Sequence, residues 1–404
     1  MWRHFKTNSD ELYKTIFMKT IAIRLAFILI ALAAGTLIFL FLTKIGDRGK
    51  GPLSDLTGAF SSQIASIEKK ITDTRESRSS SLQWFNRYRY NTKLMVTADT
   101  VFLGAYDDLT AESYESIVAL EDSLKIKLPL ISLYTAWGSK SIQMFPQLRA
   151  QAIYDLGSIP VITWEPWLDD FDPEFYPIDS KAENKNMGGM KLIAEGKFDV
   201  YIDKWATEAK KFGKPFFLRL GHEMNDPYRY PWGPQNNKPE EFIAAWRHIK
   251  ERFIKAGAIN VLFLWSPHPA YSYKEFYPGY DNVDWTGVTV LNYGTVATWS
   301  KWWTLQDIFN KSYKDLSLYG KPMMITELGS LVTGGDRAKW FSQALDSFTY
   351  KYPAVKAVVF FHTHNDITTT YKSIDWSFKT DAKVVTTLQH AFTTWGKQKQ
   401  EKLK

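Results

Sequence analysis

The segment PFFLRLGHEMN (Pro215–Asn225) passes without interruption from an apolar stretch into a glutamate, Glu223, and it decides the fold. A second segment, MMITELGS (Met323–Ser330), does the same at Glu327. Continuous apolar runs of this length are typical of parallel strands that are buried on both faces. In a (β/α)8 barrel such strands end at one common face, where active sites are built. The two segments therefore predict two parallel strands that present their glutamates at the same end of a barrel.

The rest of the chain supports this α/β class, a (β/α)8 TIM barrel over residues 96–396. From Val101 onward, short apolar segments alternate with helical stretches, and their number is that of the barrel. The segments span residues 101–105, 128–134, 158–164, 215–220, 260–265, 286–291, 321–326 and 355–361. Longer connections follow the third segment, over residues 167–198, and the fourth, over residues 225–237. Both leave from the active-site end of the barrel, so they are expected to shape a cleft.

The net charge of +7 is concentrated at the two ends of the chain. Residues 1–50 hold eight Lys/Arg against three Asp/Glu, and the basic tail at residues 397–404 holds four Lys against one Glu. Residues 51–396 are therefore close to neutral, which argues against a nucleic-acid-binding surface on the barrel. The chain has no cysteine, so no disulfide can stabilise it.

Residues 25–43 carry no charge over nineteen positions, which is long enough for a helix to cross a bilayer. More Lys/Arg precede this stretch than closely follow it, so the positive-inside rule predicts a signal anchor with residues 1–24 in the cytoplasm and the barrel outside. A cleaved signal peptide with a site at Ala31-Leu32-Ala33 is the alternative, and it would make the protein secreted. Against cleavage, the apolar stretch continues well past Ala33.

Residues 44–95 are predicted to be a helical spacer between the anchor and the barrel. Apolar residues recur at every third or fourth position, which indicates an amphipathic helix, and the serine-rich residues 77–81 interrupt it. The apolar positions are Leu53, Leu56, Phe60, Ile64, Ile67 and Ile71. A short dimerising coiled coil is the alternative, although the pattern covers fewer heptads than such a coil needs.

A pair of glutamates on one barrel face suits the hydrolysis of a glycosidic bond. One carboxylate attacks the anomeric carbon, and the other carboxyl group protonates the leaving oxygen. Because side chains alternate along a strand, Arg219 and Glu223 are expected to share the inward face of the fourth strand, and Ile325 and Glu327 that of the seventh. Arg219 is predicted to hold a carboxylate ionised, with a structural salt bridge inside the barrel as the alternative.

The sequence His-Glu-Met-Asn at residues 222–225, followed by Tyr-Pro-Trp-Gly at 230–233 and Ile-Thr-Glu-Leu-Gly at 325–329, resembles glycoside hydrolase family 26, the β-mannanase family of a retaining clan. The resemblance extends over about residues 101–395. It implies that Glu223 on strand four is the acid/base and that Glu327 on strand seven is the nucleophile.

The resemblance also implies roles for residues around the two glutamates. His222 and Asn225 are expected to bind sugar or to support Glu223. Tyr293 is expected to donate a hydrogen bond to the nucleophile, with a plain core role as the alternative. The chain departs from the family pattern at Asp226, where members commonly carry glycine, and at His268, where they carry asparagine. These departures leave the sugar open among β-mannan, β-glucan, xylan and an exopolysaccharide.

Aromatic side chains bind the apolar faces of sugar rings, and several tryptophans lie at strand ends or in the loops that follow. These candidates are Trp137, Trp164, Trp232, Trp265 and Trp376. Each is weighed against a plain core role, and Trp232 is favoured by its motif. Glu165 and His268 are expected to line the cleft. His362 and His364, together with His222 and His268, are residues of a type that could bind a metal ion. We instead assign His362 to substrate binding, and we expect neither a metal nor a cofactor.

Taken together, these patterns predict a membrane-anchored, outward-facing, endo-acting hydrolase of a β-linked polysaccharide, with no nucleic-acid partner. Two alternatives stay open. The first is a transglycosylase that remodels a glycan made by the cell. The second is a non-catalytic polysaccharide-binding barrel tethered to a polysaccharide synthesis or export machine, against which the paired glutamates argue, because binding alone does not need both of them.

Overall fold

The computed structural model describes residues 81–111, 114–172, 174, 186–367 and 373–401. All of them belong to one compact unit that spans residues 60–404. Eight parallel strands, paired in chain order, close into a barrel. The strands are β1 (Phe102–Asp107), β2 (Leu130–Ala136), β3 (Ile159–Glu165), β4 (Phe216–Leu220), β5 (Val261–Trp265), β6 (Trp285–Asn292), β7 (Met323–Ser330) and β8 (Val355–His362). The predicted barrel is confirmed, and each predicted segment overlaps its strand.

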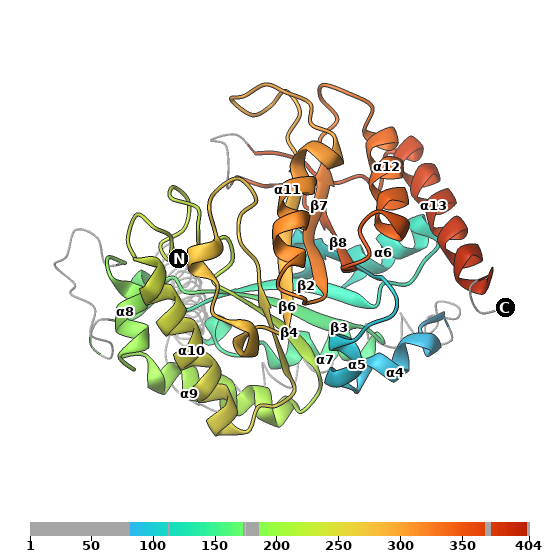
Figure 1. The fold of residues 1–404 in the computed structure, drawn as a ribbon. Helices are drawn as coiled ribbons and strands as arrows, with labels where there is room; N and C mark the ends of the chain where they lie inside the picture. Colours follow the sequence, from blue (N-terminus) through green and yellow to red (C-terminus); the bar gives the residue numbers. More distant parts are fainter. Residues whose placement is uncertain (1–80, 112–113, 173, 175–185, 368–372, 402–404) are drawn as a thin grey trace, which may run out of the picture. The chain divides into compact units, whose positions relative to one another are not determined.

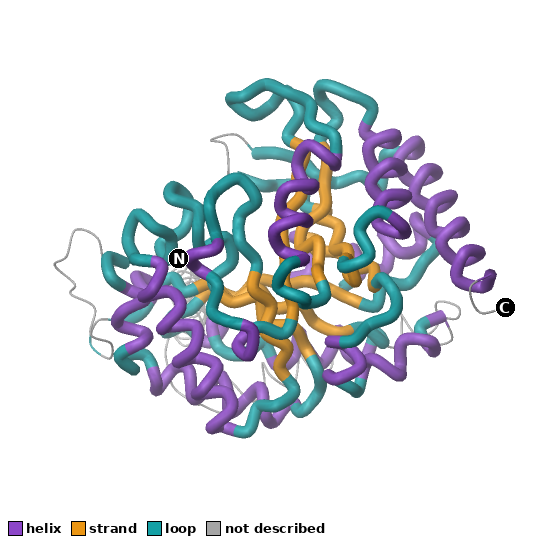
Figure 2. The backbone as a smooth tube through the Cα atoms, in the orientation of Figure 1, coloured by secondary structure: helices purple, strands orange, loops and turns teal. Residues whose placement is uncertain are grey.

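Helices cover the outside of the barrel (Figures 1 and 2). They are α6 (Glu115–Leu124), α7 (Gln147–Asp155), α8 (Gly189–Ala194), α9 (Asp199–Phe212), α10 (Pro239–Ala256), α11 (Leu305–Ser317), α12 (Arg337–Tyr350) and α13 (Ala382–Glu401). Figure 1 shows α8, α9 and α10 grouped on one side and α12 beside α13. Short 3₁₀ turns are η2 (Asp108–Ala111), η3 (Ser141–Gln143), η4 (Leu168–Asp170), η5 (Lys274–Phe276) and η6 (Tyr280–Asn282).

The longest internal helix, α10, shows how the sequence sets a helix and its buried face. Pro239 occupies the first turn, where its missing N–H costs nothing. The Glu241 carboxylate accepts a hydrogen bond from the backbone N–H of Lys238 at 2.8 Å, and Gly257 ends the helix in the left-handed conformation. Its buried side chains recur at helical spacing and face the barrel: Phe242, Ala245, Trp246, Ile249 and Phe253.

Strand β7 is irregular next to Glu327. Its pairing register shifts against β6 between Val288 and Thr289, and against β8 between Ile325 and Leu328. A bulge adds a residue to one strand and redirects the side chains beside it. The simple alternation expected from the sequence therefore does not continue through this part of β7, and Glu327 pairs in register with Thr289.

The described end of the predicted spacer packs into the barrel. From Ser81 the chain forms η1 (Gln83–Phe85), α4 (Asn86–Arg89) and α5 (Thr92–Val96). Leu82, Phe85, Tyr88 and Met95 are buried within the same apolar core as the strands. Phe102, the first residue of β1, contacts Phe85 and Tyr88 with ring centroids 5.3 and 5.0 Å apart. Residues 81–96 thus close the barrel at the end where the strands begin.

The predicted anchor at residues 25–43 and the spacer up to residue 80 lie outside the described residues. Among the residues that are described, no helix is both long enough and apolar enough to cross a membrane. At the other end of the chain, α13 runs through the predicted boundary at residue 396 and includes residues 397–401 of the basic tail.

Candidate active site

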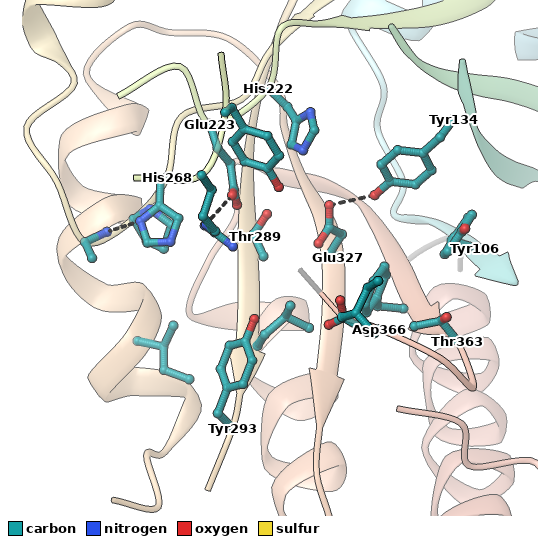
Figure 3. Close-up of a pocket in the computed structure, with 18 of the residues that line it drawn as sticks. Tyr106, Tyr134, His222, Glu223, His268, Thr289, Tyr293, Glu327, Thr363 and Asp366 are labelled. Atoms are coloured by element: carbon teal, nitrogen blue, oxygen red, sulfur yellow. Dashed lines mark hydrogen bonds and ion pairs between the residues drawn. The ribbon is translucent and has the colours of Figure 1, made fainter. Parts of the chain in front are cut away.

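A cavity of about 720 Å³ opens where the strands end, and both glutamates line it (Figure 3). Strand ends, the loops that follow them and one helix, α11, supply its wall. The other polar and charged lining residues include Tyr106, Tyr134, Glu165, His222, Arg229, Tyr230, His268, Thr289, Tyr293, Asp307, Lys311, Thr363 and Asp366. Apolar and aromatic surface comes from Trp167, Leu291, Trp299, Trp303, Ile308 and Phe361. Figure 3 shows both carboxylates directed into this space.

Glu327 is held by donors from two other strands. Its Oε1 accepts a hydrogen bond from Nη1 of Arg219, on β4, at 2.6 Å. The same oxygen accepts the Tyr134 hydroxyl, on β2, at 2.8 Å. Arg219 also donates from Nη2 to Oγ1 of Thr289 at 3.2 Å. Both donors bond Oε1, and neither of them bonds the second oxygen, Oε2.

Glu223 lies three residues beyond the end of β4, in a turn rather than on the strand. Its φ of 52° is in the left-handed region, and Gly221 precedes it with a φ of 47°. The backbone N–H of Glu223 donates to the Ser266 carbonyl at 2.7 Å, which fixes the turn against the end of β5. Oε2 of Glu223 accepts a hydrogen bond from Nη2 of Arg229 at 2.6 Å.

The two carboxyl groups are buried and influence each other electrostatically. Burial favours the neutral form of Glu223, but the charge of Arg229 overrides it and lowers the pKa of Glu223 to about 2. Burial raises the pKa of Glu327, against the opposing charge of Arg219, and the negative charge of Glu223 raises it further. In this state of the site, Glu223 is ionised, and any proton shared by the pair resides on Glu327.

His222 and Glu165 lie beside the glutamate pair. His222 is 2 % exposed, and burial lowers its pKa, so its ring is neutral at neutral pH. Its Nδ1 lies 4.0 Å from Oε1 of Glu165 and has no hydrogen-bond partner among the described residues. Burial raises the pKa of Glu165 to about 7. Both side chains line the cavity, as was expected of Glu165, and sugar binding by His222 stays a prediction.

Asn225 supports a neighbouring loop, whereas His268 lines the cavity. Asn225 does not line the cavity; its side chain accepts the His268 N–H at 2.7 Å and donates to the carbonyls of His268 and Tyr271. It therefore fixes the loop after β5. His268 lines the cavity, with Tyr271 stacked on its ring at 4.9 Å.

The five candidate tryptophans are buried, and none of them lines the cavity. Trp137 and Trp164 pack on each other and around Tyr201, outside the barrel wall. Trp265 packs against Tyr273, Tyr277 and Tyr319. The favoured residue, Trp232, is 1 % exposed and donates from Nε1 to the His222 carbonyl at 2.7 Å. In this structure it supports the turn that carries Glu223 and offers no face to a sugar.

The remaining candidates lie on the β6 and β8 side. His362 is fully buried, with Nδ1 bonded to Asp107 at 2.9 Å and Nε2 accepting the Lys379 N–H, so it lies behind the cavity wall. Trp376 donates to Asp366 at 2.8 Å and packs on Tyr293. Tyr293 does line the cavity. The tyrosine hydroxyl that hydrogen-bonds Glu327 at 2.8 Å is that of Tyr134.

Several lining residues were not among the sequence candidates, namely Tyr106, Tyr134, Arg229, Tyr230, Trp299 and Trp303. Tyr134 lies in the second predicted segment. The alternation of side chains along that strand was the only local feature that could have indicated that Tyr134 points into the barrel. Arg229 and Tyr230 lie in the connection of residues 225–237, which was predicted to shape the cleft. Nothing in the sequence separates Trp299 from the tryptophans of the core.

Among the residues that the structure describes, two groups of side chains each place three ligand-type atoms within 4.8 Å of one another. In the first, Asp107, His362 and His364, both ring nitrogens of His362 are already hydrogen-bonded. In the second, Glu223, Asp226 and His268, the Arg229 guanidinium binds both carboxylates. We therefore assign neither group to a metal.

Residues 181–379 match the model of glycosyl hydrolase family 26. Over 292 residues the chain is 31 % identical to endoglucanase H of Acetivibrio thermocellus, covering 70 % of this chain and 29 % of that protein. The chain thus spans less than a third of this relative.

Solved structures share the fold. A family 26 endo-β-1,4-mannanase domain from Bacillus sp. JAMB-750 superposes with a TM-score of 0.54 at 15 % identity, covering 79 % of this chain and 90 % of that one. A family 26 β-mannanase of Bacteroides ovatus gives 0.51 at 17 % identity, covering 78 % and 92 %. At these identities the similarity shows the barrel alone.

Proposed function

We propose that the chain is a retaining, endo-acting hydrolase of a β-linked polysaccharide, because residues 181–379 match the model of glycosyl hydrolase family 26 and the chain is 31 % identical to an endoglucanase over 292 residues. Glu327 is the nucleophile and Glu223 is the acid/base. The observation that carries this proposal is that two buried glutamates line one cavity and each is bound by its own arginine. Such a pair is what glycoside hydrolysis requires.

The contacts of Glu327 suit a nucleophile. Arg219 and Tyr134 fix the carboxylate through Oε1, so Oε2 attacks the anomeric carbon of the sugar bound in the cavity. Glu223 protonates the leaving oxygen, and a glycosyl ester on Glu327 results. Water activated by Glu223 then hydrolyses this ester, and the anomeric configuration is retained over the two displacements.

The substrate follows from the cavity and from the named relative. Lining residues from the loops after β5 and β6 continue the cavity beyond the carboxylates, through His268, Trp299 and Trp303. A site that extends beyond the reacting bond suits cleavage within a chain. The relative at 31 % identity is named an endoglucanase, so we propose a β-glucan as the first substrate to test, ahead of β-mannan and xylan.

Reducing-end release from mixed-linkage glucan, mannan, xylan and the exopolysaccharide of the source cell tests the proposal, with Glu327→Ala as the paired variant. We expect release from at least one β-glycan by the wild type and none by the variant. Azide should partly rescue the variant and give a glycosyl azide of inverted configuration, because a small anion fills the vacated nucleophile position. Wild-type turnover by Glu327→Ala would remove this residue from the mechanism.

The same assay separates the two alternative functions. A transglycosylase would lengthen added oligosaccharides and release few new reducing ends. A binding barrel would retain polysaccharide without cleaving it, and Glu327→Ala would leave that binding intact.

We also propose, from the sequence of residues 25–43 alone, that the barrel is held outside the cytoplasm by an anchor. Recovery of the full chain in the membrane fraction, with its N-terminal Met-Trp-Arg intact, would support this localisation.

A further inference from the structure

The arginines that bind the two glutamates differ in how firmly they are held. Arg219 is on β4, is 1 % exposed and donates to groups on β2, β6 and β7. It has no route out of the barrel interior. Arg229 is in the loop between β4 and α10, its side chain is 20 % exposed, and it lines the cavity. A substrate entering the cavity meets Arg229 and not Arg219.

Arg229 has a second carboxylate within reach. Its Nε donates to Oδ2 of Asp226 while Nη2 binds Glu223. Asp226 is itself fixed, since its Oδ1 accepts the Tyr228 N–H at 2.9 Å. The guanidinium can therefore leave Glu223 and keep a negative partner at Asp226.

The charged groups around Glu223 determine how its protonation changes when Arg229 moves away. The titratable groups that face it are Arg219, His222, Arg229, Tyr230, His268, Asp226 and Glu327. Burial lowers the pKa of both histidines, so they are neutral near pH 7. Arg219 is bonded to Glu327. Among these residues, Arg229 is thus the cation that keeps Glu223 ionised. A general acid must carry a proton, so Glu223 can act as one only after Arg229 has moved away.

We propose that Arg229 is a positioning residue that acts through Glu223, as a removable counter-ion of the acid/base. In the free protein it keeps Glu223 deprotonated, and the entering sugar chain displaces it onto Asp226. One proton of the carboxylate pair then moves from Glu327 to Glu223, and Glu327 is left ionised against the fixed Arg219. No other reactant is needed. This inference rests on the proposed function and explains why two similar glutamates take different roles.

The test compares pH profiles of kcat/KM for the full chain and its Arg229→Gln variant. The basic limb of this profile reports the loss of the one proton that Glu223 and Glu327 share in the free enzyme. Because Arg229 stabilises the carboxylate, its removal raises the pKa of Glu223, and we expect the basic limb to move to higher pH by at least about one unit. Arg229→Lys keeps a cation and should restore a limb close to that of the wild type.

Arg252→Gln is the matched control, because Arg252 forms ion pairs with Asp199 and Asp203 on the outside of the barrel. It removes the same charge and should leave the profile unchanged. A basic limb that stays in place in Arg229→Gln, or that moves equally in Arg252→Gln, would overturn the inference.

A second measurement does not depend on activity. Carbon-13 NMR of labelled glutamate carboxyls, with Glu223→Gln to assign the signal, follows the protonation of Glu223 directly. Its titration should move to higher pH in Arg229→Gln, and an unchanged titration contradicts the inference. If the wild type cleaves no β-glycan, the proposed function fails, while the NMR titration still decides whether Arg229 controls the charge of Glu223.

Discussion

The position of Glu223 depends on a strained backbone conformation and on one backbone hydrogen bond. A left-handed φ at a residue with a side chain costs on the order of 1 kcal/mol, and Glu223 adopts it where the chain turns out of β4. The hydrogen bond from its N–H to the Ser266 carbonyl offsets part of this cost. The result is a carboxylate carried past the strand end and over the cavity, where Arg229 reaches it.

Replacing Glu223 by alanine should affect substrates according to their leaving groups. Glycosides with basic leaving oxygens should lose about 10²–10⁴-fold in rate, because these need protonation in the transition state. Activated aryl glycosides should keep a measurable first step. Kinetics with a series of aryl glycosides measures the difference, and an equal loss across the series would assign Glu223 a structural role.

At the level of elements, the loop between β4 and α10 is held in place by packing and forms part of the site. The ring of Trp232 stacks on Tyr230 at 4.9 Å, and its Nε1 holds the His222 carbonyl. Gly233 follows in a position where a Cβ would lie 2.3 Å from the Asp226 carbonyl oxygen. This packing fixes the loop that carries Arg229 beside the turn that carries Glu223.

Trp232→Ala should therefore destabilise the protein more than it weakens sugar binding through direct contact. Truncating a buried tryptophan typically costs about 3–5 kcal/mol, whereas the sequence motif led us to expect mainly a loss of affinity. Thermal unfolding and oligosaccharide titration distinguish the two. An unchanged melting temperature with a large loss of affinity would restore Trp232 as a sugar-binding residue.

Trp299, in the loop after β6, is the better aromatic platform. It is 51 % exposed and lines the cavity next to Tyr293. Trp299→Ala should raise KM for polysaccharide about 5- to 30-fold, since stacking of this kind contributes roughly 1–2 kcal/mol, with little change in melting temperature. Trp84→Ala is the matched control, because Trp84 is 41 % exposed beside Phe102, where the strands begin. Equal effects of both variants would exclude a platform at Trp299.

At the scale of the whole described unit, the barrel is closed differently at its two ends. The end where strands finish holds the cavity, and the end where they begin is covered by residues 81–96. Tyr154 on α7 ties this cover to the barrel, since its hydroxyl bonds the carbonyls of Arg89 and Pro215 at 2.7 and 2.9 Å. The cover is part of the barrel core.

A chain shortened to begin at Thr97 should be much less stable than one that begins at Ser81. It loses buried side chains that contribute about 1.5–3 kcal/mol each, namely Leu82, Phe85, Tyr88 and Met95. Chemical unfolding of the two truncated chains measures the difference. Equal stability would mean that residues 81–96 are a spacer, as their position in the sequence suggested.

The sequence by itself determined the barrel and located both glutamates by its fourth and seventh strands, because each strand is written locally as an apolar run next to polar residues. It did not determine the strand ends, since β7 continues to Ser330, beyond Glu327. It also predicted that Arg219 orients a carboxylate, and the structure places Arg219 against Glu327 at 2.6 Å. Glu165 and His268 were expected to line the cleft, and they do.

Only the tertiary structure decided which aromatic and cationic side chains reach the cavity. Trp232 and Trp299 are the same residue type in the loops that follow β4 and β6, yet one is buried and the other lines the site. Tyr134 and Glu327 are 193 residues apart in the chain and share a hydrogen bond. Burial and such contacts depend on segments distant in sequence that closure of the barrel brings together, and no local pattern records them. The pairing of Arg229 with Glu223 depends in the same way on a loop conformation fixed by Trp232, Asp226 and the end of β5.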